Sequence, residues 1–431
     1  TDVSIDLSNS YASGADGVGI GAVSGAFAFS LGGGIVDKYY GTSGSDADAT
    51  TGNITIGLDG SQVKGAYDGI VAASKGLALG YYADASAQGG DISVSLTNES
   101  TADGYDGNGI SVYSKNYAVS KGYAYYGLYT SASAAGGTID ISLTNSAVYG
   151  SQSGIAVQDS AYAINKIGGV LIARRDGEGG GSSSTEYSSA TAVASDVTIS
   201  LSGADVEGYY GNGISIGGKY GPSAVAKVEY GKGGGIETRA PIFGSYGPVA
   251  YANGGSATLD LADGSTIYAK YSAAAFIERG AYASAFFGTA TAQGGDITVD
   301  LSGASELVSK YGSGLTAKAY AYAKGFYANG LGGNLTISLA GDSVIASKYG
   351  NGISGDVSAK SKGKYSTANG GTVSLTMDKS QIYSKYSDGF NLKGEADAKG
   401  FDSYATGTTV DISLANQAVI KSGYEGIDLN L

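Results

Sequence analysis

The chain has 431 residues, with 74 glycines but only 3 prolines, a hydrophobic fraction of 42% and a formal net charge of −13. This composition is too apolar for a disordered chain and lacks the Gly-X-Y period and the abundant proline of collagen. Cysteine and histidine are absent, which excludes disulfides, Cys/His metal sites and the catalytic pairs that use either residue. The negative net charge argues against nucleic acid or an anionic membrane as partner. The sequence contains no run of about 18 apolar residues, so it predicts no transmembrane helix.

The chain opens on an alternating strand, Val3-Ser4-Ile5-Asp6-Leu7, and similar strands recur to its end. Each of these strands closes on a leucine or methionine. The closing residues are Leu7, Leu58, Leu96, Leu143, Leu201, Leu261, Leu301, Leu339, Met377 and Leu414. From Leu261 onward they are spaced by 40, 38, 38 and 37 residues. A nearly fixed spacing of this size indicates a repeat architecture.

A polar corner, a second short strand and a turn follow each alternating strand. The most regular unit, Leu335 to Ile353, reads LTISLAGDSVIASKYGNGI. Its turn, Tyr349-Gly350-Asn351-Gly352, has the glycine and asparagine that tolerate positive φ, and we expect Gly352 to need it. The alternation has period two and glycines interrupt every long stretch, so the sequence predicts almost no helix.

The second half of each unit is an extended run with small residues on one face. From Leu315 onward this face carries only alanine and glycine, at Ala317, Ala319, Ala321, Ala323 and Gly325. The opposite face carries lysine and aromatic residues. We expect two extended arms joined by a turn near Lys324-Gly325, Lys362-Gly363 and Lys399-Gly400, with very close packing between backbones on the small face.

The closing residues of units three to six are spaced by 47, 58 and 60 residues, and the extra residues lie in the second halves of units three, four and five. The sequence predicts loop insertions at about 166–190 and 217–250 in a single elongated domain, 1–431. Insertions in repeat arrays map to loops on one side, which is often the binding side. Threonine at position 1 and the lack of a secretion signal suggest a processed form or a fragment.

One such unit cannot bury its apolar face alone, whereas stacked units place leucine on leucine and tyrosine on tyrosine about 4.8 Å apart. The sequence therefore predicts an all-β fold, a parallel β-solenoid of about ten repeats with extended Ala/Gly/Tyr-rich arms. Whether each repeat forms one wide coil or two rungs stays open.

The pattern xTISLxGxSxIxSxYGxGI resembles the repeats of bacterial autotransporter passenger domains and filamentous-haemagglutinin-like surface proteins. The resemblance covers nearly the whole chain, but it is one of pattern and composition. It implies a β-solenoid that is secreted to a bacterial cell surface and that serves in adhesion or matrix building. The unit of about 38 residues is longer than the coil expected of that family.

Acidic residues are the catalytic candidates that remain, because solenoid glycosidases and lyases use carboxylates. The candidates for this role are Asp91, Asp296, Asp300 and Asp342. A solvated face is the ordinary explanation for them, and no acidic cluster belongs to one unit. We therefore expect no enzyme and no cofactor, with a carbohydrate-acting β-solenoid enzyme or a glycan- or Ca²⁺-binding module as the alternative.

Two acidic stretches could offer oxygen ligands to Ca²⁺, Gly104-Tyr105-Asp106-Gly107-Asn108-Gly109 and Ser45-Asp46-Ala47-Asp48. Neither matches the nonapeptide Ca²⁺ repeat, and turn geometry explains the first equally well. Arg174-Arg175 in the first insertion could contact an acidic partner, although an exposed pair on a loop is the default. Asn53, Asn98 and Asn334 begin glycosylation sequons, to which we assign no role.

Tyrosine is unusually abundant, with 35 copies against 9 phenylalanines. The copies that precede the turn should stack into a structural ladder, which consists of Tyr271, Tyr311, Tyr349, Tyr386 and Tyr424. An exposed aromatic stripe that holds glycans or another fibre is the functional alternative.

Both ends of the chain read as ordinary strands with no atypical cap. Val3, Ile5 and Leu7 at one end and Ile427, Leu429 and Leu431 at the other are the expected self-association residues. The prediction is a secreted, extracellular or cell-surface structural protein whose partners are further copies of itself, surface glycans or proteins, without nucleic acid and without membrane insertion.

Overall fold

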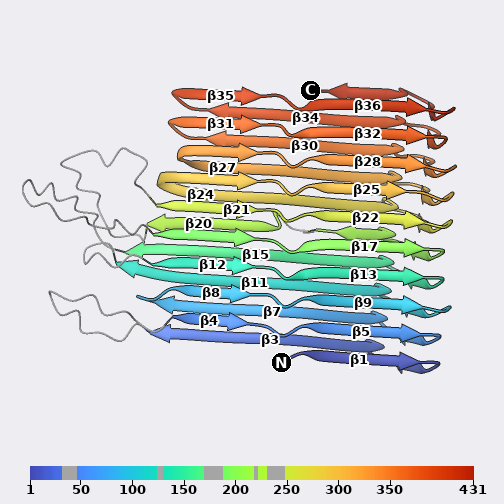
Figure 1. Ribbon diagram of the computed structural model, residues 1–431, viewed down its shortest axis with the longest axis horizontal. Coiled ribbons are helices and arrows are strands. Elements are labelled where there is room, and N and C mark those ends of the chain that lie inside the picture. The colour runs from blue at the N-terminus through green and yellow to red at the C-terminus, as the bar shows by residue number, and fades with distance from the viewer. Residues whose placement is uncertain (32–45, 124–129, 169–187, 218–221, 231–247) are drawn as a thin grey trace, which may run out of the picture.

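The repeats stack into a parallel β-solenoid, as the sequence predicts. Each repeat forms one wide coil of the stack. The computed structural model describes residues 1–31, 46–123, 130–168, 188–217, 222–230 and 248–431. Within this part all strand pairs are parallel, and no helix occurs. Figure 1 shows the coils in sequence order along the stack, with the N-terminus at one end and the C-terminus at the other.

The first sheet contains one strand from every repeat, in sequence order. Its strands are β1 (Val3–Ser8), β5 (Ile54–Asp59), β9 (Ile92–Thr97), β13 (Thr138–Thr144), β17 (Asp196–Ser202), β22 (Ala257–Ala262), β25 (Ile297–Leu301), β28 (Leu335–Ala340), β32 (Thr372–Asp378) and β36 (Thr409–Ala415). We number the coils one to ten by these strands. The ten-stranded ladder settles the open question of rungs, because each repeat adds a single strand.

The second sheet follows around a corner and has the same order. Its short strands are β2 (Tyr11–Gly14), β6 (Gln62–Gly65), β10 (Thr101–Gly104), β14 (Ala147–Gly150), β18 (Asp205–Gly208), β23 (Thr266–Ala269), β26 (Glu306–Ser309), β29 (Val344–Ser347), β33 (Gln381–Ser384) and β37 (Val419–Ser422).

The third sheet has the most strands, because most repeats add two strands to it. The chain runs away from the first two sheets along an outgoing arm and comes back along a return arm. The outgoing arms are β3 (Ile20–Leu31), β7 (Ile70–Tyr81), β11 (Ile110–Tyr123), β15 (Ile155–Gly168), β19 (Ile214–Ile216) with β20 (Ala224–Tyr230), β30 (Ile353–Lys362), β34 (Phe390–Lys399) and β38 (Ile427–Asn430). The return arms are β4 (Ala47–Thr50), β8 (Ala85–Gln88), β12 (Ser131–Ala135), β16 (Ser189–Val193), β21 (Val249–Asn253), β31 (Tyr365–Asn369) and β35 (Asp402–Thr406). Two strands hold both arms, β24 (Ala275–Gln293) and β27 (Leu315–Leu331).

Two cores of different thickness lie inside the coil. The three sheets enclose a core of isoleucine, leucine and valine that runs the length of the stack. Beyond it the outgoing and return arms form a thin wing, whose core is almost entirely alanine. An added Cβ at Gly76 on an outgoing arm would lie 3.6 Å from Cβ of Ala87 on the return arm. The small residues therefore set the separation of the two layers, as the sequence indicates.

The left-handed backbone lies at a different corner from the expected one. Gly352 does not have positive φ; that prediction is wrong. An added Cβ there would lie 2.5 Å from the carbonyl oxygen of Gly389 in the next coil, so the glycine is required by close approach between coils. Positive φ occurs instead at the corner between the first and second sheets, two residues after the closing leucine, for example at Asn9, Gly60 and Gly341.

The predicted insertions need narrower bounds. Residues 166–168 belong to β15, and β16 begins at Ser189. The second insertion, 217–250, contains β20, whose Ala224, Ala226 and Val228 are buried in the wing core. Their alternation continues the arm, which explains why Ala224–Tyr230 is no loop. The turns between β30 and β31 and between β34 and β35 lie where they were expected.

Candidate functional site

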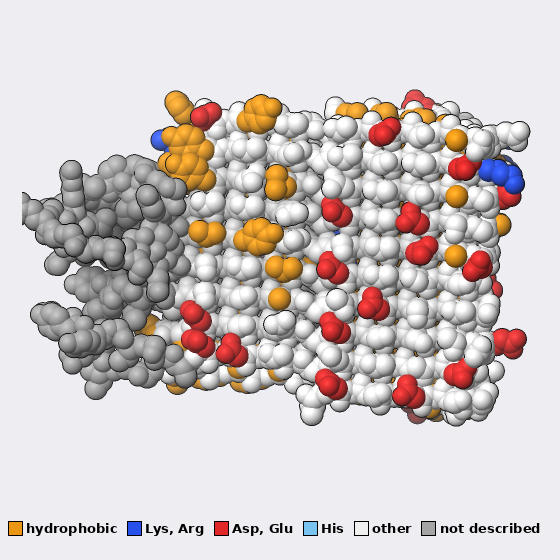
Figure 2. Space-filling model, viewed as in Figure 1, with side chains coloured by type: hydrophobic (Ala, Val, Ile, Leu, Met, Phe, Trp, Pro, Cys, Tyr) orange, Lys and Arg blue, Asp and Glu red, His pale blue; other side chains and the backbone are white. Residues whose placement is uncertain are grey.

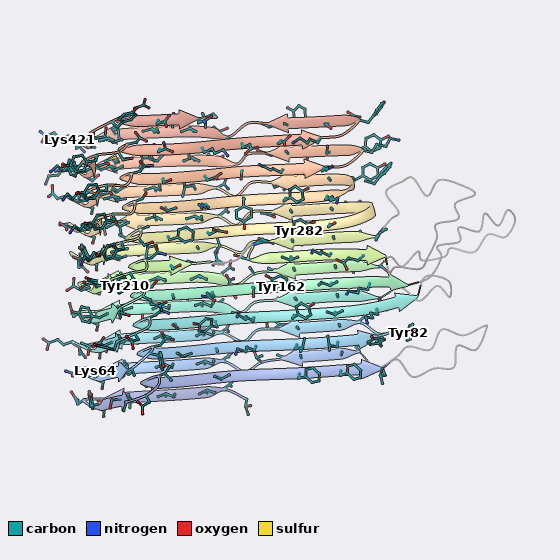
Figure 3. All side chains as sticks on the ribbon, turned by 180° about the vertical axis from the view of Figure 1, so that it is seen from behind. Lys64, Tyr82, Tyr162, Tyr210, Tyr282 and Lys421 are labelled. Carbon is teal, nitrogen blue, oxygen red and sulfur yellow. The ribbon has the colours of Figure 1, made fainter. Side chains whose placement is uncertain are left out.

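A column of tyrosine rings marks the corner between the second and third sheets. Tyr271, Tyr311, Tyr349 and Tyr386 stack in coils six to nine, with ring centroids 5.2, 5.1 and 5.2 Å apart in turn. Tyr210 continues the stack below Tyr271, at 5.7 Å, and lies at this corner in Figure 3. Such a separation leaves no room for a sugar ring between neighbours, so only the ring edges and hydroxyls face a partner.

The fifth tyrosine of the expected ladder is placed differently. Tyr424 is 80% exposed and forms no ring pair in the part of the chain that the structure describes. Coil ten therefore does not extend the stack beyond Tyr386.

Lysines accompany the tyrosine column in the same coils. Lys270, Lys310, Lys348 and Lys385 lie 5.2, 5.2, 4.9 and 5.1 Å from the centroids of the tyrosines that follow them. A side-chain hydrogen bond with Tyr386 raises the pKa of Lys385. The corner thus carries positive charge on four consecutive coils of an acidic protein.

The opposite charge lies on the face formed by the first sheet and the return arms. Neither the first-sheet strands nor the return-arm segments contain lysine or arginine among the described residues. Its outward positions are mostly serine and threonine, with scattered carboxylates, and Figure 2 shows the red acidic side chains spread over it while blue appears only at the margins. The carboxylates in these strands include Asp6, Asp48, Asp59, Asp140, Asp260, Asp300, Asp378, Asp402 and Asp411.

The acidic catalytic candidates do not converge. Asp91 and Asp296 each accept a backbone N–H from the next coil, at 2.8 Å from Thr138 N and Asn334 N respectively. Asp342 forms a surface ion pair with Lys379 at 3.0 Å. Asp300 lies opposite Asp260, and its pKa is raised by partial burial and by that neighbouring charge. Asp260 and Asp300 are paired positions on neighbouring strands of the first sheet, on its outward face.

One of the predicted Ca²⁺ ligands, Asn108, has a structural role. Asn108 N donates to Asp68 Oδ1 at 2.6 Å, and Asn108 Oδ1 accepts from Ser153 N at 2.9 Å. Asp68 and Asn108 therefore each cap a backbone amide of the next coil. Among the described residues no group of three or more carboxylates is placed to hold a metal ion.

The remaining residues that the sequence singled out do not form a site in the described part of the chain. Ser45, Arg174 and Arg175 lie outside the described residues. Asn53 belongs to the ladder that begins the first sheet, where its Oδ1 accepts from Asp91 N at 2.9 Å. Asn98 has positive φ at the corner that follows β9. These structural roles explain Asn53 and Asn98 without glycosylation.

A buried ion pair that the sequence reading missed lies where the two cores meet. Arg279 Nη1 is 2.8 Å from Asp159 Oδ1, and both side chains are fully buried. Arg279 belongs to coil six and Asp159 to coil four. Burial raises the pKa of Asp159, and the Arg279 guanidinium opposes this shift.

The described strands of coil five leave an interval next to this contact. β19 pairs with residues 155–157 of β15, and β20 pairs with residues 161–167, so no described strand of coil five pairs with residues 158–160. The Arg279 side chain reaches from coil six to Asp159 in coil four and also donates to the carbonyl of Ser256 at 2.7 Å. The sequence did contain a signal, since Arg279 and Asp159 interrupt otherwise apolar inward positions with opposite charges.

The two outermost described coils carry the residues that were expected to associate between copies. Val3, Ile5 and Leu7 are half-buried against the Ile/Leu/Val core. Ile427, Leu429 and Leu431 are exposed by 41, 42 and 62%. β1 and β36 each have one neighbour in the first sheet.

No helix of membrane-spanning length and hydropathy occurs in the described part of the chain. Comparisons of the sequence with protein-family models and with curated proteins, and a comparison with solved structures, give no match.

Proposed function

We propose that this protein is a non-enzymatic structural component of a cell surface or extracellular matrix, which serves in adhesion or in assembly of a fibre. The observation that carries the proposal is the unbroken parallel ladder through all ten strands of the first sheet. A continuous ladder makes a stiff, repetitive body with long flat faces, which suits a spacer or a scaffold better than a site for chemistry.

The side chains on the surface support the same proposal. Three of the four acidic candidates, Asp91, Asp296 and Asp342, cap backbone amides or form a surface ion pair, and the tyrosine rings of the column stack on one another. The repeat pattern that resembles secreted bacterial passenger domains supports a location outside the cell.

Assembly through the terminal rungs is the specific form that we propose. The edge of β36 carries the same backbone donors and acceptors as every internal strand. Coil ten, to which β36 belongs, also exposes Ile427 and Leu429. A first-sheet edge of a second copy could pair with it in the register seen between internal coils. Such a head-to-tail contact does not close, so it extends into a filament.

Deletion of residues 427–431 tests this form. We expect the wild type to form filaments under the electron microscope and the deletion to shift light scattering toward monomers. Lys421→Glu, on the same coil but on the outer side of β37, is the control and should leave the filaments intact. Unchanged filaments after the deletion, or a wild type that stays monomeric at high concentration, would contradict end-to-end pairing.

A further inference from the structure

The outward face of the wing carries an apolar strip in coils one to four. The strip consists of two adjacent columns, Phe27, Leu77, Tyr117 and Tyr162 in one and Phe29, Leu79, Val119 and Ile164 in the other. The strands pair in register, so the strip extends about 14 Å along the stack and two residues across. Figure 3 shows this face, with Tyr162 on it.

The side chains of the strip reach solvent to different extents. Phe27 is 66% and Phe29 51% exposed in the outermost coil, Tyr117 is 38% exposed, and the other members are half-buried. The residues between them, such as Ala78 and Ala118, point to the other face of the strands and fill the wing core. The apolar side chains of the strip are therefore not needed for that core. Apolar patches of this kind, bordered by polar residues, mark sites of interaction.

Lysines border the strip on both sides. Lys75 and Lys115 pair in register on the side toward the Ile/Leu/Val core, and Lys121 and Lys166 pair on the side toward the tip. The outward positions of β3, β7, β11 and β15 contain no carboxylate, because Asp159 points inward. None of the four lysines forms an ion pair with a described residue.

We propose that this strip, with its lysine border, adsorbs to the surface of an anionic lipid bilayer. A flat apolar surface inserts shallowly among acyl chains while lysines on either side reach the acidic headgroups. The acidic face of the solenoid lies on the opposite side of the wing and points away from the bilayer. The net charge of −13 therefore does not oppose contact on this side, and no segment spans the membrane.

The chemistry of the strip disfavours two other partners. A second copy docked through the same strip would bring lysine columns together, and Glu229, in register with Lys166 on β20, is the one carboxylate next to the strip among the described strand residues paired with it. A polysaccharide needs hydrogen-bond partners across its whole width, whereas leucine, valine, isoleucine and phenylalanine make up most of the strip. The inference rests on this face alone and does not depend on the proposed role in adhesion or assembly.

Flotation with vesicles tests the inference on the full chain. We expect it to bind vesicles of phosphatidylcholine with phosphatidylglycerol, to bind phosphatidylcholine alone at least tenfold more weakly, and to lose binding as salt rises. The double variant Lys75→Gln/Lys115→Gln should reduce binding more than tenfold. Phe27→Ser/Phe29→Ser should reduce it by a similar factor without changing the circular dichroism spectrum.

Matched controls separate the strip from general effects of charge and apolar area. Lys360→Gln/Lys362→Gln makes the same charge change on the outgoing arm of coil eight, where Lys360 pairs with Glu395 at 2.9 Å. Phe401→Ser removes a ring that is 89% exposed outside the strip. Both should bind like the wild type.

Three outcomes would overturn the proposal. They are equal binding to both vesicle types, equal losses in the strip variants and the controls, and a concentration-dependent dimer without lipid that Phe27→Ser/Phe29→Ser abolishes. Retention by an immobilised acidic polysaccharide, without vesicle binding, would assign the strip to glycans instead.

Discussion

At the scale of single residues, the glycines of this chain serve two different physical needs. Those at the corner between the first and second sheets provide positive φ, as at Gly60 and Gly341. Gly352 and its neighbours at the next corner provide space, because the adjacent coil lies against their Cα atoms. A glycine pattern in the sequence does not distinguish the two.

Gly352→Val tests the second need. The new side chain would clash with the carbonyl of Gly389, and we expect overpacking to lower the free energy of unfolding by about 1–3 kcal/mol. Gly407→Ala is the control, because its added Cβ meets nothing within 4 Å. Denaturation midpoints measure both; a Gly352→Val midpoint equal to that of the control would contradict the steric explanation.

The tyrosine column also makes a prediction for one residue. Tyr311 stacks on a ring above and a ring below, so Tyr311→Ala should cost about 1–3 kcal/mol of folding free energy. Tyr424→Ala removes a ring without a stacking partner and should change it by less than about 0.5 kcal/mol. Equal thermal unfolding of the two variants would show that the stacking contributes little.

At the scale of elements, the wing is the unusual part of the fold. Its two layers are held by alanines such as Ala283 and Ala290, which bury little apolar area each and gain stability from close contact and parallel pairing. The thin core leaves no tolerance for larger side chains.

Ala283→Leu should therefore force the arms apart. We expect a loss of about 1–3 kcal/mol in the free energy of unfolding, with faster amide hydrogen exchange confined to β24 and the neighbouring arms. Ser284→Leu, one residue along and facing outward, should leave exchange unchanged. If both variants exchange alike, the alanines do not set the layer separation.

At the scale of the whole molecule, the stack depends on contacts between neighbouring coils, and no described strand of coil five pairs with residues 158–160 of coil four. The Arg279–Asp159 pair connects coils four and six next to this interval. A buried pair contributes little net stability, but loss of one partner leaves an uncompensated charge. The pair is therefore a point at which removal of one side chain should weaken the contact between coils four and six.

Arg279→Met tests this connection. It should destabilise the protein by about 3–5 kcal/mol, and the double variant Asp159→Asn/Arg279→Met should recover part of that loss because the stranded carboxylate is gone. Chemical denaturation followed by hydrogen exchange shows whether coils four to six open first. A double variant less stable than Arg279→Met alone would contradict the explanation by charge.

The sequence by itself determined the solenoid, since alternating strands with closing leucines at a nearly fixed spacing can bury their apolar faces only by stacking. It also indicated the tyrosine stack and the close packing of the alanine faces, which follow from in-register repetition. Three features depended on the tertiary structure. The choice between one wide coil and two rungs required knowing which strands pair, because in the described residues outgoing arms pair with outgoing arms and return arms with return arms. The pairing of Arg279 with Asp159 required knowing how coils four to six stack, because these residues are 120 positions apart in sequence. The separation of an acidic face from a face with lysines and apolar residues required knowing which arm covers which side, since alternation gives the two faces of a strand but not the side of the molecule that each one reaches.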